Sequence, residues 1–249
     1  MHPVSTADTA IAWNDAWSGS APVTYPAGAI LFRQDEPVRA AFHIVRGAVK
    51  TVREESDRDV ITSLRLPGWL LGAAAAILRR PHVVSAVTLV ESDLRAVLIG
   101  DFERMTGESS FASALQRMLA REVYDDALAV GRLGGQSPRE RLAGLLSEVA
   151  VALPQAEREG CLLPPLKVLE IAQMVGITRE HASRLLSELA REGAVRRRAG
   201  RLTIPSGSPL LPAARAHDLS QCRPGEINRR ARPRLATAQA RVAPAAMPR

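Results

Sequence analysis

The segment from Val168 to Leu189 constrains the fold of this chain more than any other part of the sequence. It fits two short helices packed against each other, because small Ala172 stands where the helices would touch and Gly176 tolerates a left-handed turn between them. Thr178 is a good N-cap for the second helix. The core positions around the turn are all apolar: Ile171, Val175, Ile177, Ala182 and Leu185. The spacing predicts a helix-turn-helix, with an ordinary packed helix pair as the alternative.

The outward positions of the second helix carry side chains that can read base edges in a DNA major groove. Arginine pairs with guanine, glutamate accepts from cytosine, and serine bonds bases or phosphates. The candidate DNA-binding residues of this helix are Thr178, Arg179, Glu180, Ser183 and Arg184.

A basic hairpin is predicted directly after this helix pair. Glu192-Gly193 ends the helix, and the run from Val195 to Ile204 reads as two strands with a turn at Ala199-Gly200. Such a wing would place its cations on the phosphate backbone. The alternative is a solvated charge run. The candidate phosphate contacts are Arg196, Arg197 and Arg198.

The first third of the chain has a different pattern, with short β-like runs separated by turn residues from about Pro22 to Glu103. Strands at this spacing predict a β-sandwich or a barrel-like roll. The expected strands are Val23–Tyr25, Ala29–Phe32, Ala41–Val45, Ala48–Val52, Val60–Leu64, Val83–Leu89 and Leu94–Ile99.

A long amphipathic helix is predicted from Ser109 to about Leu133. Its length and apolar stripe favour pairing with a second copy of the helix, although the stripe can also pack on the chain's own β-roll. Gly131, Gly134 and Gly135 are expected to break the helix and form a hinge. The run Ser137-Pro138-Arg139-Glu140 then begins a new helix with a capping box.

The net charge of +7 says little about where an anionic partner would bind. Residues 1–136 carry −2, residues 137–205 carry +3, and residues 206–249 carry +6. The last segment is rich in Arg, Pro and Ala and reads as disordered, either solvated or a non-specific phosphate contact. No apolar run is long enough for a membrane span, and the two cysteines exclude a disulfide scaffold. A soluble cytoplasmic protein is expected.

The chain resembles the Crp/Fnr family of bacterial transcription regulators, mainly in IAQMVGITREHASRLLSELAREGAV and more weakly in YPAGAILFRQDEP, FHIVRGAVKTV and LPGWLLG. Arg179-Glu180 matches the cyclic AMP receptor protein pattern, whereas Glu180 with Ser183-Arg184 matches the Fnr branch. The resemblance implies an α+β protein that binds palindromic double-stranded DNA as a homodimer, with RNA polymerase as a possible partner. The expected parts are an N-terminal arm (1–21), a cyclic-nucleotide-binding-like β-roll sensor (22–108), a dimerisation helix and hinge (109–136), a winged helix-turn-helix (137–205) and a disordered tail (206–249).

The resemblance fails where the family binds a cyclic nucleotide. The positions of the family's ribose-binding Glu and phosphate-binding Arg hold Ala73 and Val84 here, so no physiological cyclic AMP or cyclic GMP binding is expected. The degenerate pocket should be apolar, suited to a hydrophobic effector or to none. The pocket residues implied by the resemblance are Gly68, Leu71, Gly72, Ala73, Ala74, Val84 and Ser85.

No cofactor and no metal are predicted. The first cysteine, Cys161, lies beyond the β-roll, which excludes an Fnr-type iron–sulfur cluster. Haem at His43 or His82 is the weaker alternative. A cupin-like metalloenzyme would need a facial set of His and carboxylate ligands, and no His-x-His pair is present. A regulator without any effector remains a further alternative.

Overall fold

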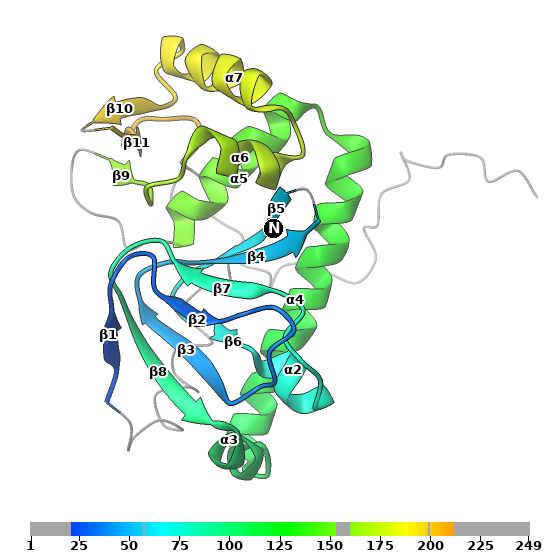
Figure 1. Ribbon diagram of the computed structural model, residues 1–249. Coiled ribbons are helices and arrows are strands. Elements are labelled where there is room, and N and C mark those ends of the chain that lie inside the picture. The colour runs from blue at the N-terminus through cyan, green and yellow to red at the C-terminus, as the bar shows by residue number, and fades with distance from the viewer. Residues whose placement is uncertain (1–20, 57, 153–159, 199, 212–249) are drawn as a thin grey trace, which may run out of the picture. The chain divides into compact units, whose positions relative to one another are not determined.

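The computed structural model describes residues 21–56, 58–152, 160–198 and 200–211. These residues form an α+β protein, as predicted, in which a β-roll is followed by helices and a small sheet (Figure 1). The arm predicted for residues 1–21 lies outside the described residues except for Ala21, and so does the tail predicted for 206–249 from residue 212 onward.

The β-roll consists of two antiparallel four-stranded sheets. One has the order β1-β8-β3-β6 and the other β2-β7-β4-β5. The strands are β1 (Val23–Tyr25), β2 (Ile30–Phe32), β3 (Ala40–Arg46), β4 (Val49–Glu55), β5 (Arg58–Arg65), β6 (Leu70–Leu71), β7 (Ser85–Thr88) and β8 (Ser92–Leu98). The seven expected strands are all present within a few residues, and the short β6 is the one that the sequence pattern missed.

One helix, α2 (Ala73–Leu78), lies between β6 and β7. Two more follow the last strand of the roll: α3 (Ile99–Thr106) and α4 (Ser109–Gly135). The first half of α4 belongs to the β-roll core, because Phe111 and Met118 are buried there and the ring of Phe111 packs edge-on against Phe102. The second half exposes apolar side chains instead: Val123, Tyr124, Leu128 and Val130. The apolar stripe of α4 therefore packs into the β-roll core in its first half and is exposed in its second half.

The glycines of α4 do not break the helix where the sequence suggested. The helix continues through Gly131 and Gly134 and ends at Gly135. A glycine inside a helix costs only about 1 kcal/mol relative to alanine, which a long hydrogen-bonded helix tolerates. The next helix, α5 (Pro138–Ala152), begins as predicted, since the Glu140 amide donates to Ser137 Oγ and the Ser137 amide donates to Glu140 Oε2.

The remaining elements form the helix-turn-helix and its wing. They are β9 (Cys161–Leu162), α6 (Val168–Val175), α7 (Arg179–Arg191), β10 (Arg196–Arg198) and β11 (Arg201–Ile204), with the sheet order β10-β11-β9. Their buried core includes Leu142, Leu146, Ile171 and Leu186, and Leu210 joins it. Residues 206–211 are thus packed on this domain, contrary to the prediction of a tail from 206, because Leu210 adds apolar area to the core and Ser208 Oγ donates to the Ala194 carbonyl.

The turn between α6 and α7 gives a stability test. Gly176 has φ +71°, and the Ile177 amide donates to the Ala172 carbonyl at 3.0 Å. Gly176→Ala should lower the free energy of unfolding by about 1–2 kcal/mol, because an L side chain is strained in the left-handed region. Gly144→Ala is the matched control: Gly144 lies inside α5, a Cβ there meets nothing within 4 Å, and stability should rise by about 0.5–1 kcal/mol. Urea unfolding measures both, and equal effects would contradict the role of Gly176.

Candidate DNA interface and effector pocket

One face of α7 is buried, and this fixes what the other face presents. Ala182, Leu185, Leu186 and Leu189 pack into the domain core. The helix begins as predicted at Thr178, whose side chain accepts a hydrogen bond from the His181 amide at 3.2 Å. Because an α-helix turns every 3.6 residues, the intervening side chains point outward. The exposed set contains the predicted Arg179, Glu180, Ser183 and Arg184.

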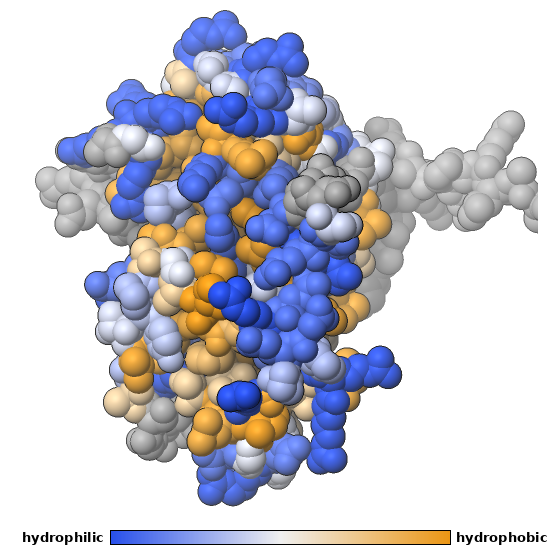
Figure 2. All heavy atoms as spheres, in the orientation of Figure 1, coloured by the Kyte–Doolittle hydropathy of each residue, from blue (hydrophilic) through white to orange (hydrophobic). Residues whose placement is uncertain are grey.

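A shallow groove of about 490 Å³ runs along this exposed face. It brings together Arg179, Glu180, Ser183 and Arg184, and within the described part of the chain no ion pair ties up these two arginines or Glu180. Figure 2 shows hydrophilic residues over the top of the molecule, where α7 lies. The groove also includes residues that sequence reasoning did not name: Val168, Ser187, Glu188 and Arg191.

Two arginines of α5 that were also missed bind the two helices of the helix-turn-helix. Arg139 pairs with Glu192 and, at 3.6 Å, with Glu188. Arg141 Nε donates to the Val175 carbonyl at 2.9 Å, at the end of α6. No local sequence pattern indicates these contacts, because they join positions 34 to 53 residues apart.

The wing forms as predicted, with β10 antiparallel to β11 and Arg196 opposite Thr203. Arg196, Arg197 and Arg198 are exposed. In contrast, Arg201 folds back and donates from Nε and Nη2 to the Leu163 carbonyl, which holds the loop before α6. The third strand of this sheet, β9, is too short to be recognised from the sequence.

A cavity of about 310 Å³ lies between the β-roll and α4, in the region where the resemblance implied an effector pocket. Leu71, Gly72, Ala73, Ala74 and Val84 line it, as the resemblance implied. The two other predicted residues do not line it. Gly68 forms a turn in which its amide donates to the Ile44 carbonyl, and Ser85 bonds Glu54 and the Gln34 amide on the opposite side of its sheet.

The pocket is mostly apolar, as expected, but it also has a polar wall. One wall carries hydroxyl groups, with Thr51 Oγ1 at 2.8 Å from Thr62 Oγ1 and at 2.6 Å from Ser63 Oγ. Arg65 of β5 pairs with Glu122 of α4, and its guanidinium lies 3.9 Å from the Trp69 ring centroid. This polar wall comes from β4, β5 and α4, whereas the expected pocket residues all lie between Gly68 and Ser85.

The two histidines of the β-roll lie in different surroundings. His43 is buried on β3, and burial lowers its pKa to about 4, so the imidazole is neutral at pH 7. His82 lines the pocket and stacks on Phe32, with ring centroids 3.8 Å apart. Among the described residues, no group of three or more His, Cys, Asp or Glu side chains is arranged to hold a metal ion.

A winged helix-turn-helix attached to a β-roll defines the class of DNA-binding transcription regulators, and comparisons with known proteins agree. Residues 22–109 match the family model of the cyclic nucleotide-binding domain, and residues 140–210 match that of the Crp-like helix-turn-helix domain. The transcriptional regulatory protein btr of Bordetella pertussis is 30% identical over 174 residues, which cover 68% of this chain and 71% of btr.

Two further relatives have similar coverage. The cyclic AMP receptor protein of Thermus thermophilus is 29% identical over 191 residues, or 75% of this chain and 84% of that protein. The structure of FixK2 from Bradyrhizobium japonicum is 26% identical with a TM-score of 0.65, covering 74% of this chain and 92% of FixK2. The chain belongs to the Crp/Fnr family of transcription regulators. In the described part of the chain, no helix combines the length and apolar character needed to cross a membrane.

Proposed function

We propose that this regulator acts as a homodimer on a palindromic DNA site, with α4 as the dimer helix. The observation that supports the dimer is the uncovered apolar stripe on the second half of α4. Val123 and Val130 are each 70% exposed and Tyr124 is 65% exposed. Val123 and Val130 are seven residues apart, which is the spacing of a helix pair. A second α4 would cover these side chains and would bring two reading helices to one DNA molecule.

The face of α7 is the proposed base-reading surface. Arg184 and Glu180 are one helical turn apart, and Arg179 and Ser183 form the parallel row. Thr178, at the N-terminus of α7, would lie beside the phosphate backbone. The three arginines of β10 would contact phosphates without reading sequence. RNA polymerase is a further proposed partner, and the cytoplasm is the proposed location.

We further propose that cyclic AMP does not control this protein, although a relative carries the name of a cyclic AMP receptor. Ala73 and Val84 offer a cyclic phosphate and a ribose neither a cation nor a carboxylate acceptor. The arginine that does line the pocket, Arg65, is already paired with Glu122. The pocket would therefore take a different, partly polar effector, or the protein would act without one.

The proposed division between base reading and phosphate contact predicts different effects for two arginines. Arg184→Ala should cost about 1–3 kcal/mol of binding free energy at one base pair and relax the preference there. Arg197→Ala should weaken binding to all sequences alike and reduce the salt slope by about 1. Binding to a library of site variants at several salt concentrations measures both. If the two variants show the same profile, the assignment of roles is wrong.

The pocket chemistry predicts no response to cyclic nucleotides. Isothermal titration of the protein with cyclic AMP or cyclic GMP should give no binding heat, and neither nucleotide should change DNA affinity. The Thermus cyclic AMP receptor protein, titrated under the same conditions, is the positive control. Micromolar binding to the present protein would contradict the proposal.

A further inference from the structure

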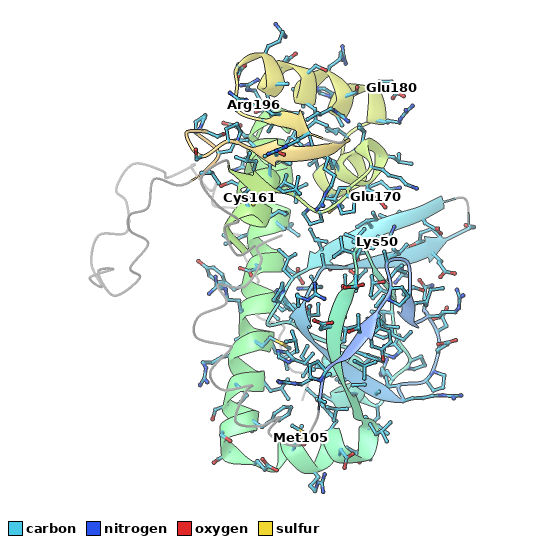
Figure 3. All side chains as sticks on the ribbon, turned by 90° about the vertical axis from the view of Figure 1, so that its left-hand side faces the viewer. Lys50, Met105, Cys161, Glu170, Glu180 and Arg196 are labelled. Carbon is cyan, nitrogen blue, oxygen red and sulfur yellow. The ribbon has the colours of Figure 1, made fainter. Side chains whose placement is uncertain are left out.

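The first helix of the helix-turn-helix lies against the β-roll, at a contact that the sequence pattern did not indicate. Lys50 of β4 points toward Glu170 of α6 (Figure 3), and its Nζ lies 2.7 Å from Glu170 Oε1. The two residues are 120 positions apart in the chain. One turn further along α6, Gln173 Nε2 donates to the Asp59 carbonyl of β5 at 2.8 Å. Two polar contacts thus join α6 to neighbouring strands of one sheet.

The ion pair is partly shielded from water, and its carboxylate has a second hydrogen-bond partner. The Lys50 side chain is 23% exposed and the Glu170 side chain 10%. The second oxygen of Glu170 accepts from the Lys167 amide at 2.8 Å, so the carboxylate is held by α6 itself before it meets the lysine. A partly buried pair with a preorganised carboxylate is screened less by salt than an exposed pair.

Apolar contacts continue across the same boundary. Ala48, Leu64 and Leu66 of the β-roll segment belong to the buried cluster that also contains Ile171 and Leu146. Between α4 and α5, in contrast, only Gln136 and Ser137 connect the helices. This joint is one attachment between the two parts, because the Ser137–Glu140 capping box and the Arg141 Nη1 donation to the Gln136 carbonyl hold it to α5. The contacts at α6 supply a second attachment.

Docking through α6 leaves the reading surface open. Arg179, Glu180 and Arg184 on α7 stay exposed, and so does the wing. Figure 1 shows α6 next to β4 and β5, with α7 on the far side of α6. The contact therefore holds the domain without covering the groups that would touch DNA.

We propose that the Lys50–Glu170 pair, supported by the Gln173–Asp59 hydrogen bond, is a latch that fixes the orientation of the helix-turn-helix on the β-roll. In the dimer this sets the separation at which two reading helices meet the DNA. The inference rests on the proposed dimeric function. Lys50 is a positioning residue: it touches no base, and it acts through α6 by reducing the orientational freedom lost on binding.

Hydrogen exchange tests the latch without DNA. β5 is the edge strand of its sheet, and it lies against α6. Lys50→Met should increase deuterium uptake in peptides from Arg58–Arg65 and Val168–Val175, whereas Lys50→Arg should match the native protein. The matched control is Arg46→Met, which removes a cation paired with Asp93 at 2.7 Å within the β-roll and should leave both peptides unchanged. Native uptake in Lys50→Met would overturn the latch.

DNA binding tests the effect of the latch on the dimer. One duplex carries a palindrome selected from a random DNA pool, and a second duplex carries a single half-site of it. Lys50→Met should bind the palindrome about three- to tenfold more weakly and tolerate altered half-site spacing, because the domain orientation is no longer fixed. Affinity for the single half-site should stay native, as should both affinities of Arg46→Met. Equal losses on both duplexes, or none, would overturn the latch. Failure of the native protein to select any site would instead contradict the proposed function, while the exchange result still decides on the latch.

Discussion

The burial of one face of α7 is the constraint on which the DNA-binding end of this molecule depends. Ala182 and Leu185 have almost no exposed surface, and they leave the helix a single way to lie on α5 and α6. Burial of such side chains contributes about 1.5–3 kcal/mol for each large one, far more than the exposed charges can gain from one another. Arg179, Glu180 and Arg184 are therefore turned outward because their apolar neighbours are turned inward.

The helix α4 divides its apolar residues between two purposes. Phe111, Leu115 and Met118 complete the β-roll core, so the β-roll and the start of the helix share one core. Val123 and Val130 join no buried cluster in the part of the chain that the structure describes. Such a helix is suited to dimerisation. Its first half is packed in the β-roll core, and its exposed second half can pair with the same helix of a second copy. In such a dimer the pocket beside Glu122 and the stripe that begins at Val123 would lie on neighbouring residues of one helix.

The sequence predicts well those features that local rules determine. The left-handed Gly176, the Thr178 cap, the Ser137–Glu140 capping box and the basic hairpin all follow from residue types at short spacings. Short elements such as β6 and β9 cannot be predicted from the sequence, because a strand of two residues shows no periodicity.

Features that depend on long-range contacts were missed or misjudged. The polar wall of the pocket combines the Thr51 hydroxyl group with the Arg65–Glu122 ion pair. The latch pairs Lys50 with Glu170. No spacing rule connects such distant positions. The net charge was a poor guide for a related reason: it counts cations wherever they stand, whereas the reading surface depends on a few side chains that the core of one domain turns outward.

Selection of bound sequences from a random DNA pool shows whether this regulator reads DNA as a dimer. A homodimer with one reading helix per subunit should recover a palindrome whose half-site centres are about one helical turn, or roughly 34 Å, apart. Recovery of a single unrepeated site, or of no consensus at all, would contradict the account of this protein as a dimeric, sequence-specific regulator.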